Sequence, residues 1–171
     1  MDIELLNELA VKKPDWNYIL IGPIVKIDPA TLPRHGNIYY LGQKTYNELP
    51  GYIAHWDVAM MPFAINESTR FISPTKTPEY LAAGKPVVST PVHDVVRSYS
   101  ESDLVYFGAT ADQFTDAIER ALSIADRSNW LRSVDRLLSL NSWGRTCENM
   151  VKHINRTLSK QKQAKKEKHN V

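Results

Sequence analysis

Pro-Thr-Lys-Thr-Pro-Glu-Tyr-Leu-Ala-Ala-Gly-Lys-Pro-Val-Val-Ser-Thr, residues 74–90, is the most informative run in the chain. Its first part predicts a short helix within residues 74–83, and Gly84 closes that helix. Residues 86–90 are then predicted to form a strand, and the apolar run without alternation at 18–21 is typical of a strand buried on both faces. A helix followed at once by a buried strand predicts one unit of a parallel α/β sheet.

The chain on either side repeats this alternation of helices and short apolar strands. Further strands are predicted at 18–21, 37–41, 57–63 and 104–107. Further helices are predicted at 2–13, 46–55, 92–99, 110–124, 128–139 and 144–159. Because right-handed crossovers join such strands, we predict an α/β fold with a doubly wound parallel sheet and additional C-terminal helices. Ligands of such folds bind at the carboxyl ends of the strands.

Length and composition limit the classes of function. The 171 residues, 43% of them hydrophobic, suit one globular domain, and Cys147 as the single cysteine excludes an internal disulfide and a cysteine-built metal site. Gly-x-Gly-x-x-Gly, P-loop, Gly-x-Ser-x-Gly and Asp-x-Asp motifs are missing, and the histidines have no metal-ligand spacing. We therefore expect no nicotinamide, flavin or metal. The first residues do not resemble a signal peptide, so we expect a cytoplasmic protein.

Charge is distributed unevenly along the chain. Residues 152–171 carry seven basic residues and one acid, whereas residues 1–151 carry 14 basic and 18 acidic residues, a net charge of −4. An acidic body excludes a broad nucleic-acid-binding surface. We expect a domain at 1–155 followed by a basic, disordered tail at 156–171, which could contact an anionic membrane surface.

The polar loop and helix start after strand 57–63 carry candidate anion-binding groups. Ser73 can cap a helix whose first turn offers free backbone N–H groups and the charge of Lys76, unless Pro78 moves the helix start to Thr77. Arg70 is close enough in sequence to add a second positive charge.

The carboxylate of Glu79 follows the cations Arg70 and Lys76 closely in the sequence. Glu79 lies three residues after Lys76, so both side chains share one helix face. Lys76 could bind phosphates and Glu79 could accept hydrogen bonds from ribose hydroxyls, a pair of groups that would suit a nucleoside diphosphate. A solvated Lys76–Glu79 ion pair explains the same spacing equally well. His93 and Asp94 follow the end of strand 86–90, where Asp in a first helical turn is more often a simple cap.

Residues 74–90 resemble the donor-site segment of glycosyltransferases with the GT-B fold, closest to the retaining enzymes of glycosyltransferase family 4 and their group 1 relatives. Similar pieces occur in the same order at 13–23, 37–42 and 46–63, so the resemblance covers about residues 3–155. It implies a Rossmann-like domain, half of a GT-B fold, that holds the nucleotide of a sugar donor.

The resemblance also implies roles for individual residues. Glu79 matches the second glutamate of the family's Glu-x7-Glu motif and would bind the ribose, whereas Phe71 stands at the first glutamate, which leaves the sugar contacts open. The residues that would face the diphosphate are Arg70, Ser73, Thr75 and Lys76. The residues in loops that border the base are Gly22, Pro23, Gly42 and Gln43.

Two parts of the family architecture have no counterpart in this sequence. The N-terminal acceptor domain is missing, and with it the acceptor-side catalytic groups. The first strand of the donor domain is missing as well, and the family places it between strands like 18–22 and 57–62. We expect the gap to be filled by rearrangement, by a borrowed strand or by a homodimer.

The resemblance therefore implies a donor-binding domain of a retaining glycosyltransferase, one that takes part in polysaccharide biosynthesis. The complete enzyme would transfer a hexose from a nucleotide diphosphate sugar to a glycan or lipid-linked acceptor, without a metal or other cofactor. Its expected partners are the nucleotide-sugar and the missing N-terminal domain, and we expect the isolated chain to be inactive. The alternative is a non-catalytic remnant that binds a nucleotide or another protein.

Overall fold

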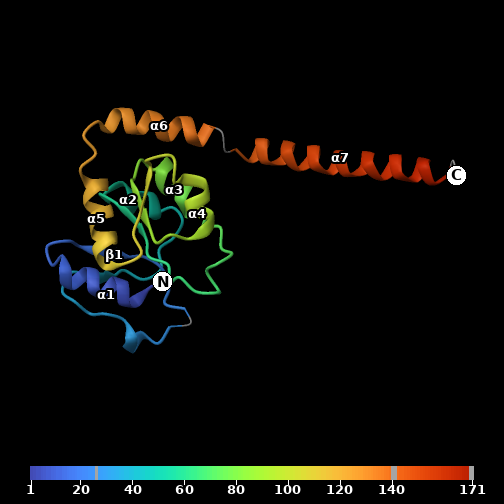
Figure 1. The fold of residues 1–171 in the computed structure, drawn as a ribbon. Coiled ribbons are helices and arrows are strands. Elements are labelled where there is room, and N and C mark those ends of the chain that lie inside the picture. Colours follow the sequence, from blue (N-terminus) through green and yellow to red (C-terminus); the bar gives the residue numbers. More distant parts are fainter. Residues whose placement is uncertain (26, 140–141, 170–171) are drawn as a thin grey trace. The chain divides into compact units, whose positions relative to one another are not determined.

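The computed structural model describes residues 1–25, 27–139 and 142–169 (Figure 1). The chain divides into two compact units, residues 1–134 and residues 135–171. This boundary differs from the one at 155–156 that the sequence predicts. The strands and the candidate residues all belong to the first unit.

The strands are parallel and form two separate sheets. In one sheet β1 (Tyr18–Leu20) pairs with β2 (Ile38–Tyr40). In the other, β4 (Val87–Ser89) lies between β3 (Ala59–Met61) and β5 (Val105–Phe107).

The parallel order confirms the predicted α/β class, and every strand falls inside its predicted range. Within the described residues, no strand connects β1 to β3. Residues 1–10 do not supply one either, since Ile3–Lys12 form helix α1, capped by the carboxylate of Asp2, which accepts from the N–H of Leu5 at 3.0 Å. The sheet is therefore divided at the position where the sequence predicts a missing strand.

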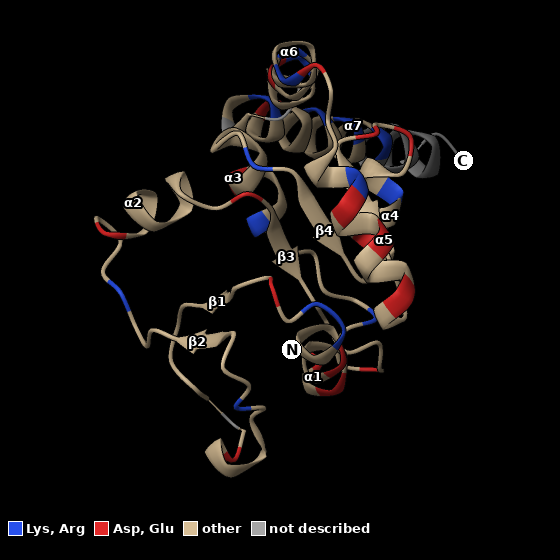
Figure 2. Cartoon of the chain, turned by 90° about the vertical axis from the view of Figure 1, so that its left-hand side faces the viewer, with Lys and Arg blue, Asp and Glu red and all other residues tan. Residues whose placement is uncertain are grey.

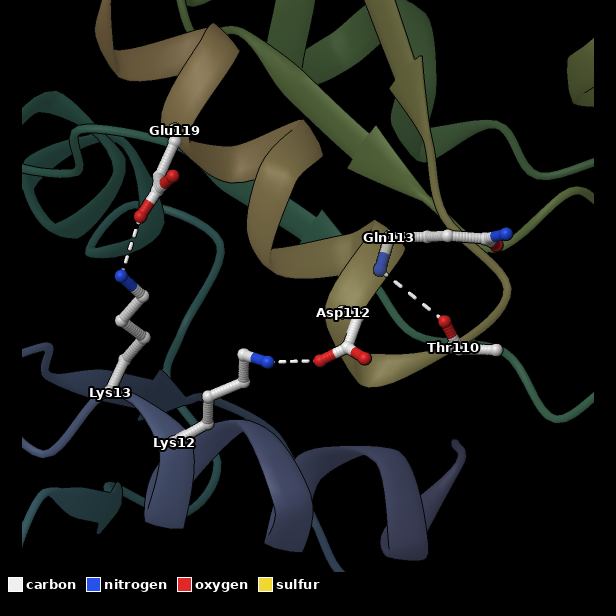
Figure 3. A network of polar contacts seen from close by, with 6 residues as sticks. All are labelled: Lys12, Lys13, Thr110, Asp112, Gln113 and Glu119. Atoms are coloured by element: carbon white, nitrogen blue, oxygen red, sulfur yellow. Dashed lines mark hydrogen bonds and ion pairs between the residues drawn. The ribbon is translucent and has the colours of Figure 1, made fainter.

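The helices of the first unit follow the predicted order. They are α1 (Ile3–Lys12), α2 (Leu49–Ala54), α3 (Lys76–Ala82), α4 (His93–Tyr99), α5 (Ala111–Leu122) and the start of α6 (Arg127–Ser139), with a 3-10 turn at Pro29–Thr31. The Thr110 hydroxyl accepts from the N–H of Gln113 at 3.3 Å and so caps the start of α5 (Figure 3). Thr45 donates its N–H and hydroxyl to the Glu48 carboxylate at 2.8 and 2.7 Å in the turn before α2.

Helices α1 and α5 form the main core together with strand residues from both sheets. Phe114 and Leu9 are fully buried in one apolar cluster that also holds Tyr18 of β1 and Val88 of β4. The Tyr18 hydroxyl donates to the Leu9 carbonyl at 3.0 Å, and burial raises the pKa of Tyr18 to about 12. This shared core connects the two sheets even though their strands do not pair.

Two surface ion pairs join the same helix pair. Lys12 contacts Asp112, and the Lys13 ammonium lies 2.5 Å from the Glu119 carboxylate (Figure 3). These groups are partly or largely exposed, so water screens the attraction and each pair adds little to stability. The buried apolar contacts therefore hold α1 against α5.

The second unit contains the long helix α7 (Trp143–His169). It runs through most of the tail at 156–171, where the sequence predicts disorder, because Lys, Gln, Ala and Glu are good helix formers. Four apolar side chains of α7 are exposed, namely Met150, Val151, Ile154 and Leu158. The predicted break at 140–144 falls partly on residues 140 and 141, outside the described residues. Among the helices that the structure describes, none is long and apolar enough to cross a membrane.

Candidate functional site

The carboxyl ends of β3 and β4 are held together by the side chain of Thr90. Its hydroxyl accepts from the N–H of Phe63 at 3.0 Å, and its own N–H donates to the carbonyl of Met61 at 3.2 Å. Thr90 is only 1% exposed, so these hydrogen bonds form away from water. They set the direction in which the loop at 62–75 leaves the sheet. Sequence reasoning missed this role, although a lone threonine ending an apolar strand was a visible signal.

Helix α3 starts at Lys76 and not at either predicted position. Thr75 occupies the cap position without a side-chain cap bond, so the prediction of Ser73 as N-cap is wrong. Pro78 lies in the first turn, where its missing N–H costs no helical hydrogen bond, so it does not shift the start to Thr77. Thr77 is instead fully buried, and its hydroxyl contacts the sulfur of Met61 at 3.6 Å. This contact anchors α3 to β3.

Ser73 interacts with the next helix, α4. Its hydroxyl donates to the carboxylate of Asp94 in α4, and this bond is the main reason that the pKa of Asp94 lies below its usual range. His93 supports the same carboxylate, with Nδ1 at 3.4 Å from Oδ1. The structure thus joins His93 and Asp94 to the loop that carries the candidates.

Lys76 and Glu79 are both exposed on the first turns of α3. Among the described side chains they form no ion pair or hydrogen bond with each other or with another residue, so the simple surface pair is not present. Arg70 follows a turn closed by Asn66 and Thr69, and its guanidinium lies 5.3 Å from the centroid of the Phe71 ring. The two cations and the carboxylate are therefore available to a ligand.

The two predicted base-side loops meet in the other sheet. The N–H of Gly22, after β1, donates to the carbonyl of Gly42, after β2, at 2.9 Å. Their backbone φ angles are +140° and +67°, values that residues other than glycine rarely adopt. Pro23 and Gln43 are exposed next to this contact. The diphosphate-side candidates lie at the ends of β3 and β4, so the divided sheet separates the two halves of the predicted site.

No group of metal ligands occurs among the described residues. Two surface cavities, of about 640 and 600 Å³, lie in the first unit. Neither cavity is lined by Arg70, Lys76 or Glu79. The candidate residues thus lie outside both cavities, in the segment that follows the carboxyl end of β3, where cationic and acidic groups could bind a phosphate-bearing ligand from one side. Figure 2 marks the basic and acidic positions along the ribbon.

Residues 3–123 match the family described as glycosyl transferases group 1. The chain belongs to this family. The match covers both sheets and helices α1–α5, so the glycosyltransferase unit coincides with the part that carries the candidate residues. Helices α6 and α7 lie outside it.

A similar protein is known from Bacillus subtilis (strain 168), under the name "Putative teichuronic acid biosynthesis glycosyltransferase TuaH". It is 33% identical to this chain over 93 residues, which make up 53% of this chain and 23% of the relative. The chain thus spans less than a quarter of the relative's length.

Proposed function

We propose that this glycosyltransferase chain is the donor-binding half of a retaining GT-B enzyme. The observation that carries the proposal is the unpaired, exposed set of Lys76 and Glu79 at the carboxyl edge of β3, inside the family match. Open α/β sheets bind their ligands at this edge. The donor would be a nucleotide diphosphate sugar, which offers phosphates to the cations and ribose hydroxyls to the carboxylate.

In this proposal the chain stabilises the leaving diphosphate by charge. The ammonium of Lys76 and the guanidinium of Arg70 would face its oxygens, and Glu79 would accept from the ribose hydroxyls. Helix α3 has seven residues, so its dipole adds little and the side chains carry the interaction. Neither a metal nor another cofactor is part of the proposal.

The complete enzyme would move a hexose to a glycan or a lipid-linked acceptor. The name of the relative, which places that protein in teichuronic acid biosynthesis, supports a role in polysaccharide formation. The acceptor-side groups would come from an N-terminal domain, so the isolated chain would show little or no transfer. Measurable transfer by the chain alone would contradict this part of the proposal.

The experiment that tests donor binding is a calorimetric titration of UDP, GDP, ADP and CMP, each with matching sugar donors. We expect one nucleoside diphosphate to bind selectively, and Lys76→Ala to weaken it about tenfold to a hundredfold, since a hydrogen bond to a charged group contributes about 1.5–3 kcal/mol. Lys152→Ala in α7 is the matched control, because it removes the same charge far from the site in sequence.

Equal affinity of the chain and Lys76→Ala for the bound nucleotide would contradict the proposed site. Absence of binding by all four nucleotides would favour the alternative, a non-catalytic remnant that contacts another protein. Phe71 is the observation behind that alternative, because it stands where the family motif has its first glutamate and its side chain is 85% exposed.

We further propose that helix α7 brings the enzyme to the cytoplasmic surface of an anionic membrane. One stripe of this helix is apolar and exposed, formed by Met150, Val151, Ile154 and Leu158. Seven basic residues lie between Lys152 and the end of the sequence, some between these apolar residues and the others after them. A basic amphipathic helix binds anionic lipid surfaces through apolar burial and charge attraction. The helix could therefore bring the domain close to a lipid-linked acceptor.

Sedimentation with lipid vesicles tests whether α7 binds an anionic membrane surface. We expect the chain to bind vesicles that contain phosphatidylglycerol at least about tenfold more than neutral phosphatidylcholine vesicles, since each cation near an anionic surface contributes about 1 kcal/mol. Replacing Lys152, Arg156 and Lys160 together by glutamine should remove most of the binding. Equal binding to both vesicle types, or none to the anionic ones, would contradict the proposal.

A further inference from the structure

Helix α2 lacks the features that usually hold a helix in place. Its six residues, Leu49–Ala54, include Gly51, which lowers helix propensity, and none of the six is buried. Glu48, at the cap position, makes no side-chain cap bond to the helix. Isolated helices of fewer than about 12 residues are marginal in water, so contacts from outside α2 have to stabilise it.

Packing on the neighbouring sheet does not supply this support. A cavity of about 640 Å³ is lined both by Tyr52 of α2 and by Ile19 of β1, and Leu41, directly after β2, lines it as well. Side chains that face a void lose their packing partners on that side. Contact with β1 and β2 therefore contributes little to holding α2.

The C-terminal end of α2 is held by the side chain of Lys85. Its ammonium donates to the carbonyl of Ala54, the last residue of the helix, at 2.8 Å. It also donates to the carbonyl of Trp56, two residues further on, at 2.7 Å. The last carbonyls of a helix have no partner within the helix, and a lysine is one of the side chains that can satisfy them. Lys85 thus supplies the outside support that the sequence of α2 requires.

The backbone of Lys85 belongs to the end of α3. The N–H of Gly84 donates to the carbonyl of Leu81 at 2.8 Å, and the N–H of Lys85 donates to the carbonyl of Tyr80 at 2.9 Å. Together with the φ of +69° at Gly84, these two bonds form a Schellman motif, which closes a helix. The base of the lysine side chain is therefore fixed to α3, whereas its ammonium is fixed to α2.

A contact between two aromatic rings joins the same two segments. The rings of Trp56, just after α2, and Tyr80, in α3, meet edge to face with 5.8 Å between their centroids. Tyr80 directly follows Glu79, and the same helix begins at Lys76. The end of α2 is thus attached to the helix that carries two of the candidate residues for the diphosphate and the ribose.

The other end of α2 leads to the base-side loop. Residues 41–48 connect β2 to α2 and include the base-side candidates that follow β2. Within this loop Thr45 is bonded to the Glu48 carboxylate, next to the start of α2. The ammonium of Lys44 lies 5.5 Å from the centroid of the Tyr52 ring, which belongs to α2. Because of these contacts, a shift of α2 would move the loop with it.

We propose that Lys85 is a positioning residue for the donor nucleotide. By fixing α2 to the end of α3, it sets the base-side loop at a defined distance from Lys76 and Glu79. The base and the diphosphate of one nucleotide can then bind at the same time, so the base adds to affinity and selectivity. Lys85 acts through α2 and does not touch the ligand. The inference rests on the proposed function and names a residue that governs the same site.

Hydrogen exchange tests the structural part of the proposal without any ligand. The N–H groups of His55 and Trp56 donate to carbonyls of α2 at 3.1 Å each and so report on the end of the helix. We expect both amides to exchange at least about tenfold faster in Lys85→Met than in the unaltered chain, because this end opens more often. Lys85→Arg keeps a cationic donor and should restore most of the protection. Lys12→Met is the matched control, since it removes an ammonium that contacts α5 and not α2.

Calorimetric titration of the same variants with UDP, GDP, ADP and inorganic pyrophosphate tests the functional part. In Lys85→Met the Kd of the preferred nucleoside diphosphate should rise about tenfold, because base and diphosphate no longer bind as one linked pair. The ratio between the Kd values of the other nucleoside diphosphates and that of the preferred one should fall at least about fivefold. Pyrophosphate has no base, so its Kd should stay the same. A ratio of Kd values does not depend on the fraction of folded protein, so mere destabilisation would not change it.

Unchanged exchange at His55 and Trp56 in Lys85→Met would overturn the proposal, and so would an unchanged ratio of Kd values. An equal loss of pyrophosphate binding would overturn it as well, because Lys85 would then act on the diphosphate itself. Absence of nucleotide binding by the unaltered chain would instead contradict the proposed function, and with it the role of Lys85 in donor binding. The exchange rates would still decide whether Lys85 holds α2.

Discussion

Replacing Gly108 by alanine is expected to destabilise the glycosyltransferase domain by about 3 kcal/mol or more. A Cβ at this position would lie 2.4 Å from the backbone nitrogen of Phe114 and 2.5 Å from its Cα. Overpacking typically costs about 1–3 kcal/mol. Both atoms belong to the backbone of α5, so the helix itself has to move, and the loss should lie at the upper end of this range or above it. Urea unfolding followed by circular dichroism measures the loss.

Gly36→Ala is the matched control for this substitution. No atom lies within 4 Å of a Cβ built at Gly36, so the free energy of unfolding should change by less than about 0.5 kcal/mol. If Gly108→Ala and Gly36→Ala unfolded at the same urea concentration, the close seating of α5 against the loop after β5 would be disproved. The contact is important because α5 packs between β4 and α1.

Phe114→Ala is expected to lower the free energy of unfolding by about 3–5 kcal/mol, the usual range for removing a buried phenylalanine. Phe114 is fully buried and belongs to the cluster that holds Leu9 of α1 and Val88 of β4. Its removal leaves a cavity between the two sheets, in the core that joins them. We therefore expect β1 and β2 to lose exchange protection together with the rest of the unit.

Leu122→Ala provides the comparison on the same helix. Leu122 is 49% exposed, so its truncation removes little buried area and should cost less than about 1 kcal/mol. Equal losses for Phe114→Ala and Leu122→Ala, measured by urea unfolding, would contradict the view that the α1–α5 core holds the two sheets together.

Most secondary structure follows from local patterns. The apolar run at 86–90 became β4, Thr110 caps α5, and Gly84 ends α3 with φ +69°. These features depend on residues within one or two turns of each other, which is why they can be predicted. The helix start at Lys76 is different, because the burial of Thr77 against Met61 selects it over the alternatives that the sequence left open.

Some features of the candidate site could also be predicted from local sequence, and others depend on tertiary packing. That Lys76 and Glu79 lie on one exposed helix face follows from their spacing. The bond from Ser73 to Asp94 and the bond from Phe63 to Thr90 could not be predicted, because each joins segments that only the packing of α3 and α4 on the sheet brings together.

By itself, the sequence determined the parallel α/β class, the family resemblance and the positions of the exposed charges, since periodicity, turn residues and motifs are local properties. The resemblance also implied the missing strand between β1 and β3, whereas the tertiary structure alone decided that a shared α1–α5 core joins the two sheets. Strand pairing and cavities depend on segments far apart in the chain, so their arrangement emerges only when the helices pack.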